Sequence, residues 1–125
     1  MKKIINTKKA PAPIGPYSQA VLVNNVLYAS GQVAIDPVSG NLVTGDIKTE
    51  TKQVMQNIKA ILNEAGMDFE HIIKTSIFLL DMNNFAAVNE VYGSHFIKDF
   101  PARETVQVSR LPKDVNVEIT VIAMK

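Results

Sequence analysis

The sequence predicts an α+β protein in which a mixed sheet carries two helices on one face. The apolar residues recur with the two-residue period of strands in some segments and with the period of helices in others. These segments follow one another in the order ββαβαββ, with room for one more short strand at the start. Two helices are too few to alternate with the strands as in an α/β protein. A chain of 125 residues with 46% apolar side chains is expected to form a single domain, residues 1–125.

The first third of the chain is expected to contain a stiff loop and a hairpin. Residues 4–6 can form a short edge strand, and residues 10–16 hold three prolines and a glycine, which exclude a helix. Residues 20–23 and 26–30 are predicted as two strands. Asn24 and Asn25 lie between them, and asparagine tolerates the positive φ that a two-residue hairpin turn requires.

Two helices and three strands are predicted after the hairpin. The first helix lies within residues 46–65, where Asp46 or Thr49 can cap its start and Gly66 can end it. The second helix opens at Asn83 or Asn84 and must stop before Pro101. Strands are expected at residues 72–80, 105–109 and 115–123, with a turn at 111–114 between the last two. The apolar side chains of the first helix share one face: Val54, Met55, Ile58, Ile61, Leu62 and Ala65.

One face of this sheet has no helix to cover it. In the strand at 115–123, alternate residues from Val115 to Val121 are apolar and should face the helices, whereas Glu118 and Ile122 point the other way. The strand at 72–80 ends with apolar residues on both faces. Because exposed apolar sheet faces must be buried somewhere, we expect the chain to assemble with copies of itself through the open face.

Composition and charge argue against several classes of function. Thirteen basic and twelve acidic residues leave a net charge of +1, which gives no electrostatic reason to expect nucleic acid or an anionic membrane as partner. The absence of cysteine excludes a thiol nucleophile and a cysteine zinc site. No glycine-rich phosphate loop follows a strand. With no apolar run long enough for a signal peptide or a membrane span, we expect a cytoplasmic protein.

The two histidines do not form a recognisable site. His71 and His95 have no partner at metal-ligand spacing, so no metal site is predicted. Two histidines could carry ribonuclease-like acid–base chemistry, which remains an alternative. The near-neutral charge and the lack of base-stacking motifs argue against it.

Two charged residues near the C-terminal end are candidate site residues. Arg103 stands where an irregular segment meets a strand, and a rigidly mounted guanidinium suits a carboxylate, which it can bind with two parallel hydrogen bonds. Glu118 lies between apolar neighbours in a strand, where a carboxylate is costly unless it is paired or at an interface. The structural alternative is that Arg103 lies on the surface or pairs with Glu104 or Glu118. Tyr17 and Tyr92 are by default packing aromatics.

Five short segments, taken in order, are specific enough to indicate a relationship. They are residues 14–20 (IGPYSQA), 29–32 (ASGQ), 88–89 (VN), 101–103 (PAR), and 110–115 (RLPKDV) with 117–119 (VEI). Together they resemble the Rid family, also called the YjgF family, and most closely its RidA branch. The resemblance runs over essentially the whole chain.

The resemblance implies a fold, an assembly and an activity. The fold would be chorismate-mutase-like, and the assembly a homotrimer whose sheets surround a central barrel, with active sites between subunits. The activity would be reactive-intermediate deamination. Such enzymes hydrolyse 2-imino acids, formed from 2-aminoacrylate and similar enamines that dehydratases release, to 2-keto acids and ammonia. No metal, covalent intermediate or organic cofactor is implied.

The resemblance also assigns roles to individual positions. Arg103 matches the arginine that grips the substrate carboxylate, Glu118 the glutamate that positions the hydrolytic water, and Tyr17 the loop tyrosine that closes the site. Four further positions match residues that line the site: Ser30, Gly31, Asn89 and Thr105. In the family, the backbone amide that corresponds to Gly31 donates a hydrogen bond to the substrate.

Two positions depart from the pattern of many members, and a rival function stays open. Thr105 stands where many members have cysteine, and Gln107 where many have glutamate, which can shift substrate preference. The rival is a ligand-binding or regulatory module that senses 2-keto acids. Family members have also been described as ribonucleases or translation inhibitors.

Overall fold

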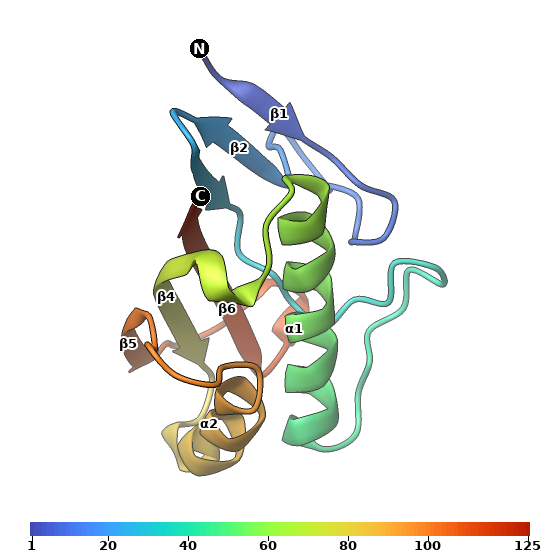
Figure 1. The fold of residues 1–125 in the computed structure, drawn as a ribbon. Coiled ribbons are helices and arrows are strands. Elements are labelled where there is room, and N and C mark those ends of the chain that lie inside the picture. Colours follow the sequence, from blue (N-terminus) through green and yellow to red (C-terminus); the bar gives the residue numbers. More distant parts are fainter.

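The computed structural model describes residues 1–125, and its elements follow the predicted order (Figure 1). One six-stranded sheet has the strand order β1-β2-β3-β6-β4-β5, in which only the β4–β5 pair is parallel. The α+β class with a mixed sheet and two helices is therefore confirmed. The elements are β1 (Lys3–Ile5), β2 (Ala20–Val23), β3 (Val26–Ala29), α1 (Ile47–Glu64), β4 (Ile72–Leu79), α2 (Phe85–Gly93), β5 (Ala102–Gln107) and β6 (Val117–Met124).

The predicted hairpin and the start of the first helix are confirmed in detail. Asn24 and Asn25 have φ of 49° and 67°, and they connect β2 to β3 as the tight turn requires. The side chain of Asp46 accepts a hydrogen bond of 2.9 Å from the backbone N–H of Thr49, which caps α1. Gly66, at φ 74°, follows the helix in the left-handed conformation that ends it.

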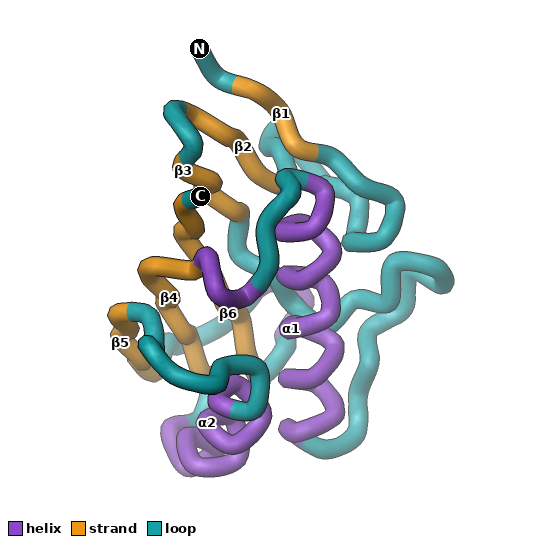
Figure 2. The backbone as a smooth tube through the Cα atoms, viewed as in Figure 1, coloured by secondary structure: helices purple, strands orange, loops and turns teal.

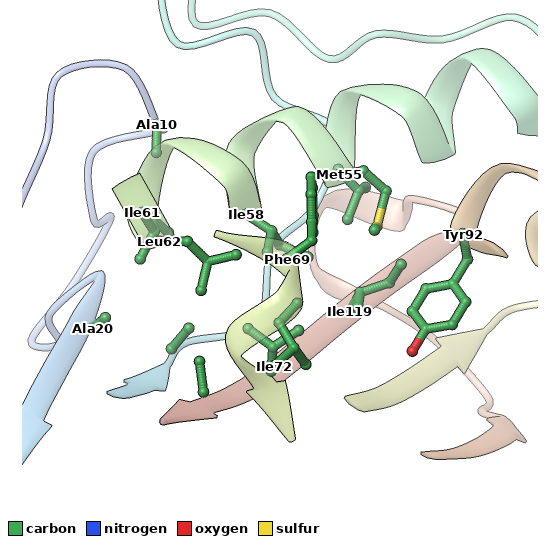
Figure 3. Packing of buried hydrophobic residues seen from close by; sticks show 14 of the residues in the cluster. Ala10, Ala20, Met55, Ile58, Ile61, Leu62, Phe69, Ile72, Tyr92 and Ile119 are labelled. Carbon is green, nitrogen blue, oxygen red and sulfur yellow. The ribbon is translucent and has the colours of Figure 1, made fainter. Parts of the chain in front are cut away.

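The hydrophobic core lies between the helices and one face of the sheet, as Figure 3 shows. The apolar face of α1 is fully buried against alternate residues of β4 and β6. Side chains in contact across this layer exclude water and stabilise the fold chiefly through burial of apolar surface. The sheet residues in this layer include Ile77, Leu79, Val117, Ile119 and Val121.

The strand that carries Arg103 differs from its prediction. We expected a half-buried strand at 105–109, but β5 runs from Ala102 to Gln107 and Val106 is 42% exposed. The reason is that β5 is an edge strand, hydrogen-bonded on one side only, to β4. Arg103 therefore lies within a strand rather than before it.

The second helix ends earlier and the last strand begins later than the sequence predicts. The second helix ends at Gly93, so Phe96 lies beyond it, although its ring still packs 4.9 Å from that of Tyr92. The last strand begins at Val117, because residues Pro112–Asp114 form a short 3-10 turn with Lys113 at a positive φ of 57°.

The second face of the sheet is open within the single chain. Figure 2 shows both helices on one side of the strands. Register pairs place Tyr28 with Ile122, Phe78 with Glu118, and Phe78 with Val106, so all five side chains lie on the uncovered face. The expected assembly through this face stays a prediction. Neither helix combines the length and the apolar character needed to cross a membrane.

Candidate functional site

Arg103 is held by the second helix. Its Nη1 donates a hydrogen bond of 2.6 Å to Oδ1 of Asn89 on α2. The rings of Phe85 and Tyr92, also on α2, have their centroids 5.6 and 5.3 Å from its Cζ. These distances are within the range of cation–π attraction. We call Arg103, Asn89, Phe85 and Tyr92 the arginine cluster.

The guanidinium lies at a shallow cavity and has no acidic partner. The cavity has a volume of about 460 Å³, and its lining includes Arg103, Asn89, Phe100 and Pro101. The salt bridges of the chain join other residues, and Glu104 pairs with Lys74 and accepts a hydrogen bond from Ser76. The structural alternative of an ion pair within the chain is therefore not observed. Most of the N–H donors of Arg103 are free for an anionic ligand.

Glu118 lies in the middle of β6 on the open face of the sheet. Its carboxylate is half-buried and makes no hydrogen bond or ion pair within the chain. Burial raises the pKa of Glu118 above its ordinary value, because the charged form loses hydration. A half-buried carboxyl group with a raised pKa and no partner is a candidate functional group.

The backbone at Gly31 lies directly against the Glu118 carboxylate. A Cβ atom at Gly31 would be 2.5 Å from Oε2 and 2.8 Å from Cδ of Glu118. Two backbone hydrogen bonds between Gln32 and Ile119, of 2.8 and 3.1 Å, fix this approach. A larger residue here would displace the carboxylate of Glu118, whereas glycine lets the backbone lie directly beside it.

Ser30 and Gln19 hold the proline-rich loop that carries Tyr17. The Ser30 hydroxyl donates a 2.6 Å hydrogen bond to the backbone oxygen of Ser18. The buried side chain of Gln19 binds the backbone of the same loop at four points, on Thr7, Ala10 and Pro11. Tyr17 itself is 53% exposed, and its hydroxyl accepts a bond from the N–H of Ile14. We call Ser30, Gly31 and Glu118 the glutamate cluster; Tyr17 lies on the loop that Ser30 binds, and it makes no hydrogen bond to this cluster.

The sheet separates the two clusters. Arg103 is the register partner of Thr75, which faces the helices, whereas Glu118 is the partner of Phe78, which faces the other way. Paired residues in a sheet project to the same side. Arg103 and Glu118 of one chain therefore lie on opposite faces. The structure brings Arg103 to Asn89 and brings Glu118 to Gly31, but it does not bring the two pairs together within one chain.

Comparisons with known proteins identify the family. Residues 7–125 match the family described as Endoribonuclease L-PSP, which includes the YjgF/Rid proteins. This chain is a member of that family. It is 54% identical to a RutC family protein of Pyrococcus horikoshii, covering 100% of this chain and 99% of that protein. It is 47% identical to the 2-iminobutanoate/2-iminopropanoate deaminase of Homo sapiens, with 100% and 91% coverage.

A solved structure confirms the Rid fold. A Rid family protein of unknown function from Yersinia pestis superposes with a TM-score of 0.98 at 51% sequence identity, and the match covers 100% of both chains. The resemblance inferred from the five sequence segments is therefore correct at the level of family and fold.

The two departures from the Rid pattern have different surroundings. Thr105 projects to the same face as Arg103, and its Oγ1 is buried without any hydrogen-bond partner in the chain. Gln107 lies at the end of β5, where its Oε1 accepts a 2.7 Å bond from the N–H of Met82 just before α2. Gln107 thus holds a turn, whereas Thr105 leaves a buried hydroxyl unpaired near the arginine cluster.

Sequence reasoning missed the aromatic part of the arginine cluster in this Rid chain. Tyr92 was assigned to packing, yet its ring lies at the guanidinium. The sequence did contain a signal for this group: Asn89 follows Phe85 by four residues, and Tyr92 follows Asn89 by three. Residues at these spacings share one face of a helix, so the three side chains could be expected to lie together. The role of Gln19 had no comparable signal, since it depends on where a loop folds back.

Neither histidine side chain contacts Arg103 or Glu118. His71 accepts a 2.9 Å bond at Nδ1 from the N–H of Asp68, and the His95 ring packs 4.7 Å from Phe69. His95 borders a larger cavity of about 610 Å³ between α1 and the segment after α2. No group of three or more potential ligands is arranged to hold a metal ion.

Proposed function

We propose that this Rid chain is an imine deaminase of the 2-iminobutanoate/2-iminopropanoate type, which hydrolyses 2-imino acids to 2-keto acids and ammonia. The observation that carries this proposal is the free guanidinium of Arg103, held by Asn89 and two aromatic rings at the edge of a cavity. A planar donor fork without an acidic partner is suited to a substrate carboxylate. Relatives from human, goat and cattle, at 47% to 51% identity, carry the name of this activity.

Arg103 orients the substrate and Glu118 activates water. With the carboxylate on Arg103, the neighbouring C=N carbon is fixed for attack, which supplies proximity. Glu118 takes one proton from the water as its oxygen adds to that carbon, and it passes this proton to the nitrogen. The proton of the new hydroxyl group then reaches the nitrogen by the same route. The resulting tetrahedral intermediate expels ammonia as the C=O bond forms. The raised pKa of Glu118 brings it closer to neutral pH, where a carboxyl group exchanges protons more effectively.

We further propose that the active sites form between subunits of a homotrimer. One chain cannot present Arg103 and Glu118 to the same molecule, because the sheet lies between them. A second copy packed on the open face would bring its own arginine cluster near Glu118. That face also exposes apolar groups such as Tyr28 and Val106, which assembly would bury. Light scattering that finds a monomer at micromolar concentration would contradict this arrangement.

A coupled assay tests the activity. A dehydratase that acts on threonine or serine generates the imine in place, and the rate of 2-keto acid formation is measured with and without this protein. We expect acceleration by the wild type and none by Arg103→Ala. Arg110→Ala is the matched control, because Arg110 is exposed and pairs only with Asp114. A protein that binds 2-ketobutyrate yet leaves the rate unchanged would instead be a sensor of 2-keto acids.

A further inference from the structure

Arg103 needs support that its own strand does not provide. It lies on β5, an edge strand bonded to β4 alone, and its side chain is exposed. A long side chain in such a position samples many rotamers, and ordering it on binding costs free energy. A guanidinium that is already oriented avoids that loss.

A buried pair of hydroxyl groups lies beneath Arg103. Tyr92, 4% exposed, donates a 3.1 Å hydrogen bond from its hydroxyl to Oγ1 of Thr75. Thr75 is fully buried on β4 and is the register partner of Arg103. Figure 3 shows Tyr92 extending from α2 with its hydroxyl toward the sheet. The helix that carries Asn89 is thereby tied to the strand beside Arg103.

Packing alone does not require these hydroxyl groups. Phenylalanine would fill the space of the Tyr92 ring, and valine would fill that of Thr75. Each hydroxyl is the partner of the other, so removing one leaves the second buried and unpaired. The bond fixes the depth and angle at which the ring meets the guanidinium, 5.3 Å from its Cζ.

We propose that Thr75 and Tyr92 are a positioning pair for Arg103. Their hydrogen bond orients the Tyr92 ring, and the ring and Asn89 together hold the guanidinium in the geometry that accepts a carboxylate. Neither residue touches the substrate. The inference deepens the proposed function and rests on it, because the carboxylate is that of the proposed substrate.

Four variants test the pair, with 2-ketobutyrate as the probe. Tyr92→Phe and Thr75→Val each remove one hydroxyl, and we expect each to raise the Kd about threefold, the effect of losing one hydrogen bond. The double variant should bind no more weakly than either single one, because both break the same bond. Tyr92→Leu removes the ring and should raise the Kd about tenfold.

A second readout is independent of ligand binding. The Nε–Hε resonance of Arg103 senses the ring current of Tyr92, so it should shift in Thr75→Val, which removes the bond to Tyr92. Because Thr75 is the strand neighbour of Arg103, Thr75→Ser serves as a second control: it keeps the hydroxyl, and the resonance should stay close to its wild-type position. Leu27→Val is the matched control, since Leu27 is fully buried in the core on β3, which β6 and β4 separate from β5. It should lower the melting temperature and leave both the resonance and the Kd unchanged.

The outcomes separate the two proposals. An unshifted Arg103 resonance and an unchanged Kd in Thr75→Val would overturn the positioning pair, as would equal losses of affinity in Leu27→Val. If the wild type binds no 2-ketobutyrate, the proposed function fails, and the resonance of Arg103 still decides whether the pair orients it.

Discussion

Replacing Gly31 with alanine should abolish most of the proposed deaminase activity with little loss of stability. The added Cβ would lie 2.5 Å from Oε2 of Glu118, about 0.9 Å inside the 3.4 Å at which ordinary contact begins. The backbone of Gly31 is fixed by the neighbouring bonds of Gln32 to Ile119, so the carboxylate must move instead. The end of a glutamate side chain can swing aside, so the cost in stability should be about 1 kcal/mol, the low end for overpacking.

The effect on turnover should be much larger. A displacement of about 1 Å at a reacting group can cost about 100-fold in rate. We therefore expect kcat of Gly31→Ala to fall about 100-fold while the melting temperature changes by only a few degrees. The assay is the coupled formation of 2-keto acid, with thermal unfolding measured on the same preparation.

A double variant identifies the cause. In Glu118→Ala the carboxylate is absent, so adding Gly31→Ala should cost nothing further. If Gly31→Ala lowers the residual rate of Glu118→Ala by the same factor as in the wild type, the loss does not come from displacing Glu118, and the reasoning is refuted.

Other substitutions probe the remaining groups of the proposed site. Arg103→Ala and Arg103→Lys should both weaken 2-ketobutyrate binding by about two to four decades, because two charge-assisted bonds worth about 3–6 kcal/mol are lost. The melting temperature should fall by only a few degrees, because Arg103 forms no ion pair and loses only its exposed contacts with Asn89 and the two rings. Glu118→Gln should lower kcat about 10²–10⁴-fold. Burial raises the pKa of Glu118, so the free energy of unfolding of the wild type should fall as pH rises from 4.5 through the folded-state pKa. Thermal unfolding measured over a pH series should show a smaller fall in Glu118→Gln. Thr105→Val removes an unpaired buried hydroxyl, so it should raise the free energy of unfolding by about 1 kcal/mol. A hydroxyl that contacts the substrate would also make this variant bind 2-ketobutyrate with a higher Kd, and an unchanged Kd would remove Thr105 from the site.

The parts of the fold that local rules control were predictable from the sequence. The turn at Asn24 and Asn25 and the cap at Asp46 depend on residues close in sequence, and both were placed correctly. The edge position of β5 was not predictable in the same way, because it depends on pairing with a strand some thirty residues earlier. The period of the side chains indicated a strand but not its neighbours.

The candidate site shows the same limit. Arg103 and Glu118 could be singled out from residue type and from the family resemblance. Whether their side chains share a face depends on register, and single-residue shifts in register reverse it. The pairings of Arg103 with Thr75 and of Glu118 with Phe78 gave information that the linear sequence lacks. The contact between Tyr92 and Arg103 likewise required the packing of α2 on β5.

The separation of the two clusters by the sheet has a genetic consequence. If each site takes Arg103 from one subunit and Glu118 from the next, an Arg103→Ala subunit and a Glu118→Gln subunit are each inactive alone but complement each other. Unfolding and refolding an equal mixture should then restore about a quarter of the sites, the fraction expected for random assembly into a ring. Two loss-of-function alleles of one gene would rescue each other in the same cell, whereas a site contained within one chain would leave every mixture inactive.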